Sequence, residues 1–150
     1  MIREISIQMD GLEFNYVFMK IAIFWEKRFE DNNFYNLNID KNLSPFAEIV
    51  QINGSENTIS VDLLESRINK DEFVIFCFLT LSIFSICEYL KLFWKYPKNK
   101  KYLFLFEPRV VAPIIYWKII HIFFNKIYTW DDSLVDNKKY FKFIWPQSWN

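Results

Sequence analysis

The chain has 150 residues, of which 52% are hydrophobic and 21% aromatic, which excludes a disordered polypeptide and supplies enough apolar surface for one buried core. Its 18 basic and 18 acidic side chains cancel, so we expect no nucleic-acid partner. The two cysteines, Cys77 and Cys87, lie in the most apolar stretch and are expected to be buried thiols rather than a disulfide. The charges just after Met1, where a signal peptide needs an apolar core, favour a cytoplasmic location.

The first half of the chain predicts two buried strands and one helix. Residues 19–25 form a short apolar run that ends in charge, as in a strand buried on both faces of a parallel sheet. A polar loop follows at 26–33. The stretch 53–70 is weakly patterned, and Leu63 and Leu64 begin at best a short helix or strand in it. Residues 72–79 predict the second strand, and 82–94 predict a helix that the following proline ends.

The second half predicts three more strands, at 102–106, 126–130 and 140–145. Between them, 114–124 predict a helix, and 131–136 a turn with a short helical element. The helix is expected to place four residues on one side: Tyr116, Ile119, Ile120 and Phe123. Strands that alternate with helices indicate an α/β fold, with a Rossmann-like parallel sheet and flanking helices.

A membrane span is the alternative for part of this pattern, because residues 73–87 contain no charge. A helix over these fifteen residues would be about 22 Å long, at ~1.5 Å per residue, which is short of the roughly 30 Å of a hydrocarbon core. Glu88 and Lys91 then interrupt the apolar run. We therefore expect a strand that leads into a helix, with a membrane-anchored protein as the alternative.

Three polar clusters follow predicted strands, at 26–33, 107–109 and 131–136, and ligands of parallel sheets gather at these carboxyl ends. Glu107 is of special interest, because it directly follows an apolar strand and burial raises a carboxylate's pKa toward the range of a general base. A salt bridge or a cap at the strand end explains the same position. The position alone leaves both interpretations open.

Other familiar sites lack their parts. The only glycines are Gly11 and Gly54, so the chain cannot form a glycine-rich phosphate loop. One histidine, His121, and two buried cysteines predict no metal site, and we expect a surface or structural role for His121. Asp131 and Asp132 are expected to cap a helix rather than to form a metal or acid/base pair.

The basic run Lys98, Lys100 and Lys101 predicts a solvated turn, with a contact to anionic lipid headgroups as its functional alternative.

Two blocks of sequence resemble the fucosyltransferases of glycosyltransferase family 10: KYLFLFEPRVVAP at 101–113 and FNKIYTWDDSLVDNKKYFKF at 124–143. The stretch 24–37 is similar to the loop after the first strand in that family. The resemblance implies an inverting transfer of fucose from GDP-fucose to a glycan acceptor, such as lipopolysaccharide or another surface glycan. It further implies that the acceptor binds to a first Rossmann-like domain and GDP-fucose to a second, and that Glu107 deprotonates the acceptor hydroxyl.

The resemblance covers only the first domain of that family. Residues 1–18 are expected to be an amino-terminal extension, and 19–150 an acceptor-side domain that stops before the donor-binding domain. Such a fragment alone is expected to be inactive and to hold no cofactor. Candidate acceptor-binding residues are, besides the catalytic candidate Glu107, four polar residues: Glu26, Asn32, Asn33 and Arg109. Arg109 departs from the second proline that relatives commonly have at its place.

Two other functions remain open: a non-catalytic remnant or glycan-binding module, and a small membrane-anchored protein. The expected partners are a glycan acceptor, a donor-binding domain and a peripheral contact with the inner membrane.

Overall fold

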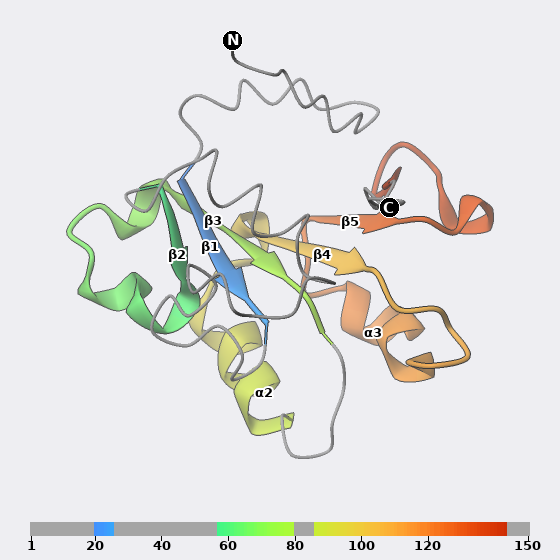
Figure 1. Cartoon of the computed structure of the whole chain (residues 1–150), viewed down its shortest axis with the longest axis horizontal. Helices are drawn as coiled ribbons and strands as arrows, with labels where there is room; N and C mark the ends of the chain where they lie inside the picture. Colours follow the sequence, from blue (N-terminus) through green and yellow to red (C-terminus); the bar gives the residue numbers. More distant parts are fainter. Residues whose placement is uncertain (1–19, 26–56, 80–85, 144–150) are drawn as a thin grey trace, which may run out of the picture.

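Six parallel strands form one sheet in the order β2-β1-β3-β4-β5-β6 (Figure 1). The structure is a computed structural model, and it describes residues 20–25, 57–79 and 86–143. The strands are β1 (Lys20–Phe24), β2 (Thr58–Ser60), β3 (Phe73–Cys77), β4 (Lys101–Leu105), β5 (Lys126–Thr129) and β6 (Tyr140–Lys142). This arrangement confirms the predicted α/β fold with a Rossmann-like parallel sheet.

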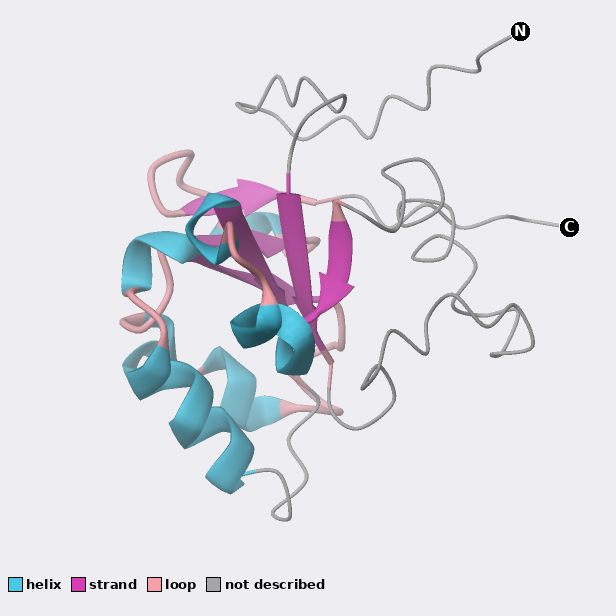
Figure 2. Ribbon diagram, turned by 90° about the vertical axis from the view of Figure 1, so that its left-hand side faces the viewer, coloured by secondary structure: helices cyan, strands magenta, loops and turns pink. Residues whose placement is uncertain are grey.

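Short helices connect the strands. The α-helices are α2 (Ile86–Lys95) and α3 (Lys118–His121), and the 3₁₀ helices are η3 (Val61–Ser66), η4 (Lys70–Glu72), η6 (Lys98–Lys100), η7 (Pro113–Tyr116) and η8 (Asp132–Leu134). Figure 2 shows α2 and α3 on the same side of the sheet. Buried residues of both connections, among them Leu92 and Ile115, belong to one core cluster with alternate residues of the strands.

The opposite face of the sheet carries a layer of aromatic rings. Side chains alternate between the two faces of a strand, so Ile75 packs in the cluster under the helices while Phe76 and Phe78 belong to the aromatic layer. The rings of Phe78 and Phe104 stack with centroids 4.8 Å apart, and those of Phe104 and Tyr128 with centroids 4.9 Å apart. Because both faces are buried, the strands are almost continuously apolar, and this is the pattern by which the sequence predicted them.

All five predicted strands are present, and their ends differ from the predicted ones by three residues at most. The predicted helix at 82–94 is present over its described part, as α2. The sixth strand, β2, was missed, because Thr58 and Ser60 flank a single apolar residue and both are buried hydroxyl side chains. The prediction that both cysteines are buried is wrong for Cys87, which is exposed on α2.

The prediction of one helix over 114–124 is also wrong. The segment forms η7 and α3, separated by Trp117 in an extended conformation with φ −70° and ψ 126°. Five β-branched isoleucines in this segment weaken its helix propensity. The expected apolar side is broken as well, since Tyr116 is buried while Ile119 is exposed.

Candidate functional site at the carboxyl edge of the sheet

Glu107 lies two residues beyond the carboxyl end of β4, in a segment held at two points. The hydroxyl of Tyr116 donates a hydrogen bond of 2.7 Å to the backbone carbonyl oxygen of Glu107. The ring of the preceding residue, Phe106, packs on Trp25 with centroids 5.0 Å apart. The Glu107 side chain is partly exposed, and within the described part of the chain its carboxylate takes part in no hydrogen bond or ion pair. The backbone is therefore fixed while the carboxylate stays available.

Arg109 stacks on Tyr116, the residue that holds the Glu107 backbone. The guanidinium carbon of the exposed Arg109 lies 5.2 Å from the centre of the Tyr116 ring, a cation–π geometry. Burial raises the pKa of the Tyr116 hydroxyl; the charge of Asp131 and, more weakly, that of Glu107 raise it further, while that of Arg109 lowers it. The hydroxyl therefore stays protonated and donates to the Glu107 carbonyl oxygen. The structure thus brings Glu107, Arg109 and Asp131 around one tyrosine, where β4 and β5 end.

The aspartates after β5 hold the backbone. Asp131 caps η8, because its Oδ1 accepts hydrogen bonds from the Ser133 amide at 3.0 Å and the Ser133 hydroxyl at 2.6 Å, and these bonds lower the pKa of Asp131. The capping prediction is confirmed for Asp131. For Asp132 it is wrong, since this carboxylate forms an ion pair with Lys142.

Sequence reasoning missed Tyr116, which was assigned to a helix side. Its signal was a tyrosine nine residues after the candidate base, close to a proline that starts a turn. Three other candidates, Glu26, Asn32 and Asn33, lie outside the described residues. Among the residues that are described, no group of three His, Cys, Asp or Glu side chains is placed to hold a metal ion.

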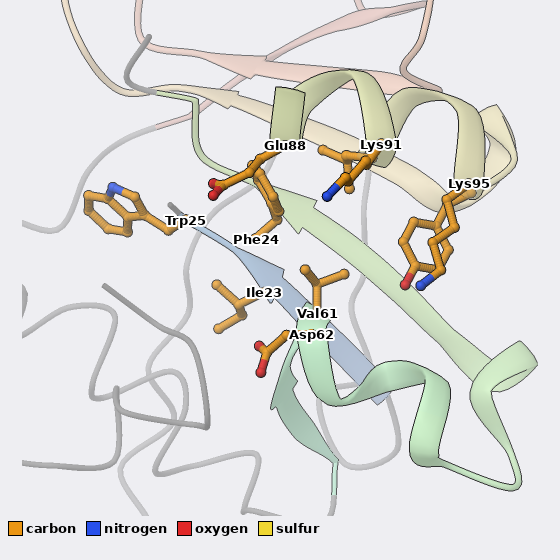
Figure 3. A pocket seen from close by; sticks show the side chains of 10 residues that line it. Ile23, Phe24, Trp25, Val61, Asp62, Glu88, Lys91 and Lys95 are labelled. Atoms are coloured by element: carbon orange, nitrogen blue, oxygen red, sulfur yellow. The ribbon is translucent and has the colours of Figure 1, made fainter. Parts of the chain in front are cut away.

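A cavity of about 310 Å³ lies between β1, η3 and α2 (Figure 3). It occurs beside the point where the strand order reverses, since β1 pairs with β2 on one side and β3 on the other, and ligands of open α/β sheets bind at such points. Its wall combines charged with aromatic side chains: Asp62, Glu88, Lys91, Lys95, Phe24, Trp25 and Tyr96. The sequence feature that could have indicated this wall is the helical spacing of Glu88, Lys91 and Lys95, which places all three along one side of α2.

Trp25 connects the cavity with the Glu107 segment. Its indole lines the cavity and also contacts Phe78 at 5.4 Å and Phe106 at 5.0 Å between ring centroids. Burial and the charge of Glu65 raise the pKa of Tyr96 to about 12, so its phenol is a neutral hydrogen-bond donor. Trp25 is thus shared by the cavity and by the ring contacts of the segment that leads to Glu107.

Two buried ionisable residues serve the fold instead. Lys101 is 1% exposed and donates from Nζ to the carbonyl oxygens of Leu92 at 3.3 Å and Phe93 at 2.8 Å, so its prediction as part of a solvated turn is wrong. Burial lowers the pKa of its amine. His121 is buried as well, with both ring nitrogens in hydrogen bonds, which confirms its expected structural role.

No family model, curated protein or solved structure matches this chain. Of the helices that the structure describes, none is long and apolar enough to cross a membrane.

Proposed function

We propose that this chain is the acceptor-side domain of a fucosyltransferase-like glycosyltransferase, with Glu107 as the general base. The observation that supports the proposal is the state of Glu107 at the carboxyl end of β4. Its backbone is fixed by Tyr116, while its carboxylate has no partner among the described residues. A structural carboxylate at a strand end would be expected to bind a cation or a backbone amide there, as Asp131 binds the Ser133 amide.

In the proposed reaction, a hydroxyl of the acceptor sugar approaches to about 2.6–3.2 Å from the Glu107 carboxylate and transfers its proton to it. The hydroxyl oxygen then forms a bond to the anomeric carbon of fucose as the bond between that carbon and the GDP phosphate breaks. Attack from the face opposite the leaving phosphate inverts the configuration. The guanidinium of Arg109 is free to bind an acceptor hydroxyl beside the base, because its only contact described is with the face of Tyr116.

The donor is assigned to a second domain, as the family resemblance implies. With Gly11 and Gly54 as its only glycines, this chain has no glycine-rich loop for a diphosphate. We therefore expect calorimetric titration of the chain with GDP-fucose to show no binding. A dissociation constant in the micromolar range would contradict this assignment.

The decisive experiment joins this chain to the donor domain of a family 10 enzyme and measures transfer of radiolabelled fucose from GDP-fucose to glycans. Glu107→Gln should lower kcat/KM by about 10²–10⁴-fold, because the amide has nearly the same volume but cannot accept the proton. Glu72→Gln is the matched control, since Glu72 lies at the amino end of β3, at the edge of the sheet opposite to Glu107, and pairs with Lys20. Equal turnover of wild type and Glu107→Gln would contradict the proposed base.

A glycan-binding module without catalysis is the second candidate. The exposed indoles of Trp117 and Trp130 favour it, because flat aromatic rings stack on the apolar faces of sugars. In that case the chain alone should bind glycans in saturation-transfer NMR, and no fusion should transfer fucose.

A further inference from the structure

The outer surface of the helical layer is unusually apolar. Of the ten large apolar side chains that are exposed among the described residues, nine lie between residues 90 and 130, and the tenth is Ile68. Five of the nine define what we call the helical patch: Leu90 and Trp94 on α2, and Trp117, Ile119 and Ile122 on and beside α3. Trp94 is 80% exposed and Ile119 is 66% exposed.

Helix α2 is in direct contact with the segment that follows α3. The rings of Phe93 and Phe123 stack with centroids 4.6 Å apart, and Trp94 meets Phe123 at 6.5 Å. Both helices lie on the same side of the sheet (Figure 2). The exposed apolar side chains therefore form one surface across α2 and α3 rather than scattered points, and apolar surface of this kind marks a binding face.

Charge identifies the partner of this surface. Although the whole chain is neutral, residues 86–130, which include both helices of the patch, contain eight basic side chains and two acidic ones, Glu88 and Glu107. Lys91 and Lys118 are exposed on the helices of the patch, while Lys101 of the same segment is buried. Tryptophan and aliphatic side chains flanked by lysine are typical of surfaces that enter the headgroup region of a bilayer.

We propose that the helical patch binds the surface of an anionic lipid bilayer. The indole rings and isoleucines enter the headgroup boundary, and the surrounding lysines bind phosphate groups of the lipids. The patch lies on the side of α2 and α3 that faces away from the sheet. In a membrane-bound chain the helices therefore lie between the sheet and the bilayer. This proposal is independent of the reaction assigned to Glu107.

Cys87 provides a native site for a probe. It is exposed, whereas Cys77 is buried, so an environment-sensitive fluorophore can be attached to Cys87 alone. Cys87, Leu90 and Trp94 lie at helical spacing on one side of α2. We expect the label to shift to shorter wavelength with vesicles of phosphatidylcholine and phosphatidylglycerol, much less with phosphatidylcholine alone, and less at high salt.

Substitutions test the surface itself. Trp94→Ser and Ile119→Ser should each lower vesicle partitioning by about tenfold, and Lys118→Gln by about fivefold. The matched control is Ile68→Ser, which removes an isoleucine that is more exposed than Ile119 from the turn before η4 and should leave partitioning unchanged. Unaltered urea midpoints will show that each variant is folded.

Three results would overturn the proposal: no shift with anionic vesicles, an equal loss in Ile68→Ser, or a shift that depends on protein concentration without vesicles. The last result would identify the patch as a contact between two copies of the chain.

Discussion

Lys101 and His121 show how single buried residues hold this fold together. Each one donates hydrogen bonds to backbone carbonyl oxygens that a helix leaves without an amide partner. Lys101 reaches the carbonyl oxygens of Leu92 and Phe93 in the last turn of α2, where a positive charge is also favoured by the helix dipole. His121 reaches the carbonyl oxygen of Ile115 in η7.

Replacing Lys101 should therefore loosen α2. Lys101→Met keeps most of the apolar stem but leaves two buried carbonyl oxygens without a donor, and we expect a loss of about 1–3 kcal/mol in the free energy of unfolding. Lys98→Met is the matched control, since Lys98 is exposed in η6 and should change stability by less than about 0.5 kcal/mol. Urea unfolding followed by circular dichroism measures both. Equal losses would mean that the Lys101 contacts contribute nothing.

His121 should make stability depend on pH. Its Nε2 donates to the Ile115 carbonyl oxygen at 2.6 Å, so in the neutral ring Nδ1 accepts from the Tyr140 hydroxyl at 2.9 Å. Burial lowers the pKa of His121 below 6.5. The hydrogen bond to Ile115 raises this pKa to a smaller extent, and the charges of nearby lysines lower it slightly further. The unfolded chain then binds more protons below pH 6.5, so this contribution is complete above pH 6.5 and declines as the pH falls.

Urea midpoints at neutral pH and at about pH 5 test this, since the carboxylates titrate mainly at lower pH. We expect wild type to lose stability over this interval and His121→Gln to lose much less. The same loss in both proteins would assign the pH dependence to other groups.

At the scale of elements, the turn before β6 depends on one carboxylate. Oδ1 of Asp136 accepts from the backbone amides of Lys138, Lys139 and Tyr140, at 2.8, 2.8 and 2.9 Å. Asn137 in the same turn has a φ of 54°, a left-handed conformation that asparagine tolerates well. These contacts set the start of β6 beside β5.

Asp136→Ala should cost about 1–3 kcal/mol, because three amides lose their acceptor. Asp136→Asn keeps an oxygen at the same place and should cost less. The hydrogen bonds from the three backbone amides lower the pKa of Asp136 below 3.8. The contribution of Asp136 to stability is therefore present above pH 3.8 and is lost as the pH falls through the lower pKa of the folded state. Thermal unfolding of the three proteins at neutral pH checks the order. A more stable Asp136→Ala would contradict it.

The helix expected at 114–124 shows where element prediction failed. Tyr116 and Ile119 are spaced for one side of a helix. The Ile115 carbonyl oxygen, however, accepts a hydrogen bond from the His121 side chain, 6 residues further along the chain. Tyr116 also turns toward Glu107 rather than along the helix side. Such contacts join residues by tertiary geometry, which hydrophobic periodicity does not contain.

For the whole molecule, the sheet was predictable and most of the site was not. Strands that are buried on both faces appear in the sequence as continuous apolar runs, such as residues 73–77. The end of each run then gives the carboxyl end of the strand. The position of Glu107 at such an end was therefore accessible from sequence. The cavity beside Trp25 was not, because it depends on how η3 and α2 approach β1. Nor could the sequence separate the buried Lys101 from its exposed neighbours.

The two cysteines offer a test of the whole fold. Cys77 lies in β3, between β1 and β4 in the sheet, and burial raises its pKa, so the reactive thiolate is suppressed in the folded protein. Cys87 is exposed on α2. We expect a thiol reagent to modify Cys87 rapidly in the native protein, and Cys77 only when the sheet opens.

The reaction of Cys77 should accelerate with urea in parallel with the loss of circular dichroism, because an interior strand cannot be exposed without global unfolding. Cys87→Ser removes the fast phase and leaves the slow one, while Cys77→Ser does the reverse, so the two phases are assigned without ambiguity. The opening free energy from the slow phase should equal the free energy of unfolding when reclosing is fast. If Cys77 reacted rapidly in the native protein, β3 would not be an interior strand of a stable parallel sheet.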